Sequence, residues 1–155
     1  MKTLVLGLGN SIISDDGVGL YVARELRNAL NRDEITVAEA SLAGLGLLDL
    51  LVGYDKAIII DAIQTSSGKP GQIHRLKSNL FDVTRHTAST HNVNFAAALE
   101  LGRQVGLDLP RQIVIFAIEV ADVSTFSEEC TPQVKKAIPK CVEMVIQEIN
   151  GNLNV

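Results

Sequence analysis

The chain has 155 residues, of which 46% are hydrophobic and 21% charged, a balance typical of one globular domain and not of a disordered chain. Its formal net charge of −4 and its lack of Lys/Arg runs argue against nucleic-acid binding, and no apolar run is long enough to span a membrane. We therefore expect one cytoplasmic domain over residues 1–155, with 151–155 as a frayed tail and with Cys130 and Cys141 as reduced thiols.

The N-terminal segment predicts a strand followed by a helix. Residues 4–6 form an apolar run that leads into a glycine-rich turn, Gly7-Leu8-Gly9-Asn10. From Asp16 to Leu30 the apolar residues fall mostly at helical spacing, which predicts a helix that Ser14 or Asp15 could cap.

The next segments predict two strands separated by a short helix. Residues 35–37 indicate a short strand and residues 44–51 a short helix. Residues 57–60, Ala-Ile-Ile-Ile, form the strongest strand signal in the chain, and their continuous apolar character favours a central strand covered on both faces. Asp61 is then expected at the carboxyl end of that strand.

The second half continues the same alternation. An edge strand, a helix, a buried strand and a final helix are expected over residues 72–76, 93–105, 112–118 and 131–150. Thr131-Pro132 favours the start of the last helix, and Pro139 is expected to kink or split it. The order βαβαββαβα predicts an α/β fold: a single-domain, open, mostly parallel twisted sheet with helices on both faces.

Three polar residues are expected at the ligand-binding rim of such a sheet, beyond the carboxyl ends of its strands. Asp16 follows the first strand, Asp61 ends the strongest strand, and His91 lies in a polar loop before a helix. Two carboxylates and an imidazole form a donor set that suits nickel, zinc, iron or manganese, and they leave coordination positions open for water or substrate.

The spacing of Asp16, Asp61 and His91 in the sequence does not exclude purely structural roles for them. Acidic residues at a helix start are favoured by the helix dipole, and a lone histidine is usually surface or a cap. His86 is close enough to His91 to be a second candidate, whereas His74 lies on the expected edge strand and is not expected to take part.

The glycine turn and the cysteines give weaker signals. Gly7-Leu8-Gly9 begins like a dinucleotide fingerprint, but position 12 is Ile where a third glycine is needed, and Glu39 is only the nearest acidic residue. The turn could still hold an anion or a peptide carbonyl. No Gly-x-Ser-x-Gly elbow is present and neither cysteine has an adjacent histidine, which disfavours a covalent mechanism. We assign no cofactor-binding residues.

Three segments resemble the nickel–iron hydrogenase maturation endopeptidases, and the resemblance covers essentially the whole chain. They are residues 4–19, which end in Ser-Asp-Asp-Gly-Val-Gly, residues 58–62 around Asp61, and His91 before an apolar helix. The resemblance implies a metal-dependent, aspartic-type endopeptidase that activates a hydrogenase by trimming the C-terminal extension of its large-subunit precursor. It also implies that Asp16, Asp61 and His91 are catalytic metal ligands. They would bind Ni²⁺ carried by that precursor, with Zn²⁺ or Cd²⁺ able to substitute in crystals.

Two departures from the family pattern concern the site and the partner. Some members carry Glu where this chain has Asp16, whose side chain reaches about one bond less. The family loop acidic-x-Gly-Thr-x-Gly is here Glu39-Ala40-Ser41-Leu42-Ala43-Gly44, which leaves the choice of hydrogenase open.

Two other functions are compatible with parts of these patterns. Gly7-Leu8-Gly9-Asn10 is also how peptidyl-tRNA hydrolases begin, but no histidine precedes His74 here and the chain is acidic. A non-catalytic, metal-dependent docking module for a nickel-loaded partner would need the same ligands, so it stays open.

Overall fold

The predicted order of elements is confirmed. The computed structural model describes residues 1–41, 46–78, 84–85 and 95–151. In chain order the elements are β1 (Thr3–Leu8), the 3₁₀ turn η1 (Ser14–Gly17), α1 (Val18–Ala29), β2 (Ile35–Ala40), α2 (Gly46–Leu51), β3 (Lys56–Ile63), β4 (Ile73–Lys77), α3 (Phe95–Gln104), β5 (Gln112–Glu119) and α4 (Pro132–Ile149).

The five strands form one open sheet in the order β2-β1-β3-β5-β4. The pairs β1·β2, β1·β3 and β3·β5 are parallel, whereas β4 lies antiparallel to β5 at the edge. The sheet is therefore mostly parallel, and the edge strand expected near residues 72–76 is confirmed.

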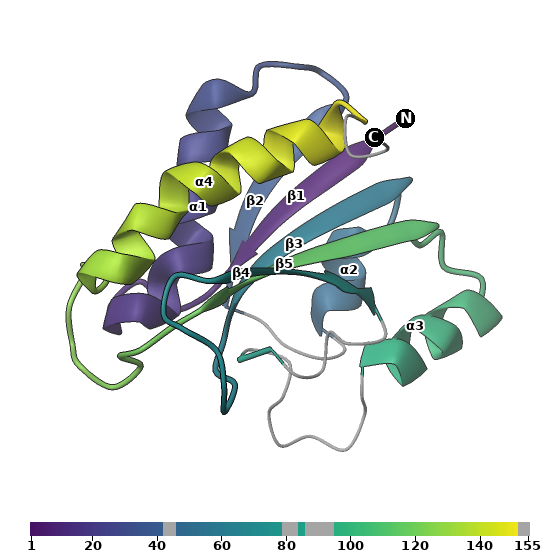
Figure 1. Cartoon of the computed structure of the whole chain (residues 1–155). Helices are drawn as coiled ribbons and strands as arrows, with labels where there is room; N and C mark the ends of the chain where they lie inside the picture. Colours follow the sequence, from purple (N-terminus) through teal and green to yellow (C-terminus); the bar gives the residue numbers. More distant parts are fainter. Residues whose placement is uncertain (42–45, 79–83, 86–94, 152–155) are drawn as a thin grey trace.

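Helices cover both faces of the sheet, with α1 and α4 on one face and α2 and α3 on the other (Figure 1). Alternate residues of β3 supply the two cores: Ile59 and Ile63 pack with α2 and α3, while Ile58 and Ile60 pack with α1 and α4. Every residue of β1 and β3 is buried, which explains the continuous apolar runs in the sequence.

A buried ion pair ties the end of α4 to the amino end of β3. Lys56 Nζ lies 2.8 Å from Glu148 Oε2, and their side chains are 7% and 6% exposed. Arg75 on β4 binds the other carboxylate oxygen of Glu148 at 2.8 Å. This cluster closes the end of the sheet opposite to η1.

Two expectations about the helices need correction. Of the kink or split expected at Pro139, the split is wrong: α4 runs unbroken from Pro132 to Ile149, with Pro139 on its exposed side and the opposite side packed on the sheet. The first long helix begins at Val18, after η1, and neither Ser14 nor Asp15 caps it through a side chain. Among the described helices, none has the length and apolar character needed to cross a membrane.

Candidate functional site

The sheet has a topological switch point between β1 and β3. The chain leaves β1 through α1 to reach β2 on one side, and β3 continues toward β5 on the other. The pairing of β1 with β3 ends at Gly7 and Ile60, but β3 stays paired with β5 as far as Ile63. Open α/β sheets bind ligands beyond the strand ends at such a point.

Asp61 lies on the part of β3 that projects beyond this pairing. It is inside the strand, not at its end as expected from sequence, because β5 continues to pair with residues 61–63. Asp61 is fully buried, and its Oδ1 accepts the backbone N–H of Ala62 at 2.8 Å. The carbonyl of Ala62 accepts the backbone N–H of Arg85 at 2.8 Å. These two residues thus satisfy the backbone groups of Ala62 where β1 has ended.

Asp16 reaches the same end of the sheet from η1, and Arg85 links it to β3. Asp16 Oδ1 accepts a hydrogen bond from Arg85 Nε at 3.2 Å, while Arg85 Nη1 binds Gln64 Oε1 at 3.3 Å. The backbone nitrogen and Nε of one arginine are separated by five bonds, roughly 6 Å at full extension. Since that backbone nitrogen binds Ala62, the structure brings Asp16 close to the strand segment that carries Asp61.

The neighbouring carboxylate of Asp15 has a different environment. Asp15 is fully buried and accepts the backbone N–H groups of Ala121 and Asp122 at 3.0 and 2.9 Å, and that of Thr131 at 2.6 Å. The Thr131 hydroxyl also donates to it. Asp15 therefore holds the β5–α4 connection against η1, which is why it does not cap α1.

Close packing of α1 on the strand ends fixes the position of η1. A Cβ atom at Gly19 would lie 2.4 Å from the carbonyl oxygen of Leu8 and 2.5 Å from that of Ile60. A Cβ at Gly7 would lie 2.3 Å from the carbonyl oxygen of Gly19. These glycines permit the helix to approach the backbone of β1 and β3, a packing reason for glycine here.

The third predicted ligand cannot be placed. His91 lies outside the described residues, as does His86, so the convergence of His91 with Asp16 and Asp61 stays a prediction. Among the residues the structure describes, no group of three or more His, Cys, Asp or Glu side chains is placed to hold a metal ion.

Glu119 is a buried carboxylate just beyond the strand expected over residues 112–118. It ends β5, is 2% exposed, and accepts hydrogen bonds at 2.7 Å from both the backbone N–H and the hydroxyl of Thr65. Its Oε1 also lies 3.2 Å from His74 Nε2. Glu119 thus anchors the loop after β3. Its position at the end of an apolar run is the same signal that singled out Asp61.

Glu39, at the start of the segment 39–44 that departs from the family pattern, is paired with α1. Burial alone would raise the pKa of Glu39, but hydrogen bonds from Arg24 and Arg27 outweigh it and hold the pKa below its ordinary value. The Arg24 Nε and Arg27 Nη1 atoms lie 3.0 and 2.9 Å from the carboxylate. Glu39 is therefore ionised at neutral pH, whereas residues 42–45 of the loop lie outside the described chain.

Neither cysteine is suited to act as a nucleophile. Burial, with the Asp15 carboxylate adding to it, raises the pKa of the Cys130 thiol to about 12. Burial alone raises the pKa of Cys141 to about 12. Because the thiolate is the reactive form, both groups are inert at neutral pH.

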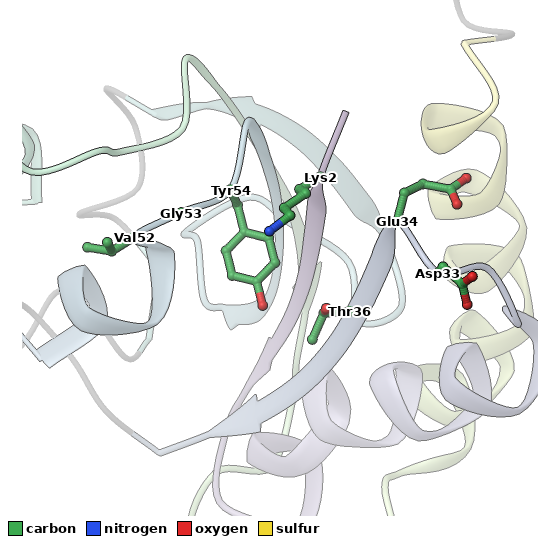
Figure 2. Close-up of a pocket in the computed structure, with 7 residues that line it drawn as sticks. All are labelled: Lys2, Asp33, Glu34, Thr36, Val52, Gly53 and Tyr54. Carbon is green, nitrogen blue, oxygen red and sulfur yellow. The ribbon is translucent and has the colours of Figure 1, made fainter.

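A cavity of about 300 Å³ opens at the opposite end of the sheet from Asp16 and Asp61. It lies at the amino ends of β1 and β2, beside the turn that precedes β3 (Figure 2). Its lining residues are Lys2, Asp33, Glu34, Thr36, Val52, Gly53 and Tyr54. Open sheets do not place their ligands at this end, so the cavity is not the candidate site.

Comparison with known proteins points to one family. The family model for hydrogenase maturation proteases (HycI) matches residues 20–148. The hydrogenase 2 maturation protease of Escherichia coli is 25% identical over 148 residues, which cover 94% of this chain and 89% of that protein. The hydrogenase expression/formation protein HupD of Thiocapsa roseopersicina is 25% identical over 151 residues, and the match covers 94% of this chain but 66% of HupD.

Solved structures of such proteases share the fold. The hydrogenase maturating endopeptidase HybD of E. coli superposes with a TM-score of 0.82 at 24% identity, covering 99% of this chain and 94% of that one. The [NiFe] hydrogenase maturation protease HybD of Thermococcus kodakarensis superposes with a TM-score of 0.70 at 26% identity, covering 95% of this chain and 98% of that one.

Proposed function

The chain belongs to the hydrogenase maturation protease family, and from this premise we propose that it removes the C-terminal extension of a nickel-loaded hydrogenase large-subunit precursor. The observation that supports the proposal is the link that Arg85 makes at the switch point of the sheet: its side chain binds Asp16, and its backbone binds Ala62, the residue after Asp61. Ligands of open α/β sheets bind at this place.

The nickel ion is part of the substrate in this proposal. Asp16, Asp61 and His91 complete the coordination of Ni²⁺ that the precursor carries, and Zn²⁺ or Cd²⁺ can replace it in crystals. Oxygen and imidazole nitrogen donors suit nickel. A cation also fits the charge of this region, because Asp16 already binds a guanidinium group and Asp61 is fully buried.

The residues of the chain act chiefly by positioning. Once the precursor is held through its metal, the scissile peptide bond lies at the site, and attack on it becomes effectively intramolecular. A carboxylate accepts a proton from the attacking water, whose oxygen bonds to the carbonyl carbon. The C–N bond then breaks and the leaving amine takes up a proton. The hydrogen bond from Ala62 to Asp61 fixes the orientation of that carboxylate before the substrate arrives.

Incubation with purified nickel-loaded precursor tests the proposal, with mass spectrometry to detect loss of the C-terminal peptide. We expect cleavage by the wild-type protein, no cleavage of nickel-free precursor, and no cleavage by His91→Ala. The matched control is His74→Ala, because His74 binds Glu119 and is not part of the proposed ligand set. An intact precursor in a stable complex would instead indicate a docking module, and normal cleavage by His91→Ala would remove that residue from the site.

A further inference from the structure

We propose that Arg85 is an internal cation that competes with metal ions for Asp16, so that free divalent ions bind poorly and a metal presented by the precursor displaces it. The proposal rests on the proposed function for the identity of that precursor. It concerns a residue for which the sequence carried no signal, since Arg85 lies in a polar stretch without any period.

The backbone of Arg85 is anchored independently of its side chain. Its N–H donates to the carbonyl of Ala62 at 2.8 Å, at the projecting end of β3. From there the side chain extends to Asp16, where Nε lies 3.2 Å from Oδ1, and to Gln64 Oε1 at 3.3 Å. The guanidinium can therefore leave Asp16 by rotation about side-chain bonds while the backbone contact to β3 is kept.

Asp16 and Arg85 differ in exposure, as we expect if Arg85 and a metal ion compete for the Asp16 carboxylate. The Asp16 side chain is 7% exposed, whereas that of Arg85 is 34% exposed. Arg85 is thus the more exposed member of this ion pair, and a cation that binds Asp16 Oδ1 has to displace its guanidinium group.

Displacement favours a metal that arrives already bound to the precursor. A free aqueous ion has to lose hydration and break the contact between Arg85 and Asp16, and only its coordination by the side chains of the site offsets these costs. A precursor-borne ion brings the binding energy of the whole protein interface. Apparent affinity is proportional to the fraction of molecules that are competent to bind, so an arginine bound to Asp16 reduces the affinity for free ions to the fraction of molecules in which it has left Asp16.

Titration calorimetry with Cd²⁺ alone, in the absence of precursor, tests the proposal. We expect Arg85→Gln to bind Cd²⁺ about tenfold more tightly than the wild-type protein, as for an Asp16 site that is open in roughly a tenth of molecules. Arg85→Lys keeps the charge but not the planar fork, so its affinity should lie between the two. Arg75→Gln is the matched control, since Arg75 pairs with Glu148 at the other end of the sheet, and it should leave the affinity unchanged.

The double variant Arg85→Gln/Asp16→Asn tests whether the gain in Cd²⁺ affinity depends on Asp16. We expect it to bind Cd²⁺ more weakly than Arg85→Gln alone. Equal affinity of Arg85→Gln and wild-type protein, with a lowered Tm in the variant, would give Arg85 a purely structural role and overturn the proposal. Absence of Cd²⁺ binding by Arg85→Gln would overturn it as well.

The cleavage assay separates this proposal from the proposed function. If the wild-type protein cleaves the precursor but Arg85→Gln gains no Cd²⁺ affinity, only the role of Arg85 is refuted. A gain in affinity without any cleavage refutes only the protease assignment.

Discussion

Asp15 and Asp16 are adjacent and chemically identical, yet we expect their substitution by asparagine to have opposite consequences. Asp15 is fully buried and accepts three backbone N–H groups and the Thr131 hydroxyl. Asp16 is bound by Arg85, which is partly exposed. Asp15→Asn should therefore unfold more easily while keeping its ability to cleave precursor, and Asp16→Asn should fold normally and cleave nothing.

The expected loss for Asp15→Asn follows from counting donors. Asparagine has one acceptor oxygen, so in either orientation its amide group faces at least one backbone N–H. If the amide faces Thr131, one charge-assisted hydrogen bond at 2.6 Å is lost, and the remaining bonds weaken because the charge is gone. A hydrogen bond to a charged group contributes about 1.5–3 kcal/mol and an unpaired buried donor adds to the cost, so we expect a loss of about 3 kcal/mol. For a chain of this size that lowers Tm by roughly 6–12 °C.

We expect Asp16→Asn to lose less stability than Asp15→Asn, because Arg85 is 34% exposed and solvent partly screens its ion pair with Asp16. Thermal unfolding followed by circular dichroism measures both variants, and cleavage is assayed well below the lower Tm. An Asp15→Asn variant with wild-type Tm and no activity would show that the roles of the two carboxylates have been reversed in our reasoning.

Two further predictions concern the thiols and the buried ion pair at the other end of the sheet. Because the thiol pKa values are raised to about 12, both cysteines should resist iodoacetamide in the folded protein at neutral pH and react with it in urea. Replacing both cysteines by alanine should preserve cleavage of the precursor. Rapid alkylation of the folded chain would contradict this prediction. Burial would raise the pKa of Glu148, but hydrogen bonds from Arg75 and Lys56 outweigh it and hold the pKa below its ordinary value of 4.5. The stabilisation that ionised Glu148 gives to the folded state is therefore complete above pH 4.5 and is lost as the pH falls through the pKa of Glu148 in the folded protein. The free energy of unfolding should then fall less steeply with decreasing pH in Glu148→Gln than in the wild-type protein.

The order and type of the elements could be predicted because each buried strand is an uninterrupted apolar run. Their lengths could not, since pairing with neighbours decides where a strand ends. The strand expected at residues 35–37 continues to Ala40 because β1 pairs with it as far as Leu8. β3 continues through Asp61 because β5 pairs with it, although a carboxylate favours the end of a strand in local sequence.

The site was predictable only where chain position alone indicated it. In the sequence, Asp16 and Asp61 come after the apolar runs of β1 and β3, the two strands that flank the switch point, and the family resemblance added His91, which stays a prediction. Sequence could not separate Asp15 from Asp16, because the partners of Asp15 lie more than a hundred residues away at 121–131. Arg85 was missed for a related reason: it is defined by its contacts with Ala62 and Asp16, and a polar loop carries no periodic signal for either.

The burial of Asp61 is itself an argument that this region serves a ligand. A carboxylate buried among apolar residues costs several kcal/mol unless a cation and hydrogen bonds compensate it, and well-packed apolar residues often replace such charges without loss of stability. Asp61 lies on the same face of β3 as Ile59 and Ile63, which belong to the core under α2 and α3. Arg85 ties the strand segment that carries Asp61 to Asp16, a carboxylate that already pairs with a cation. A buried charge on this segment is therefore what we expect if, as proposed, the substrate presents a metal ion here.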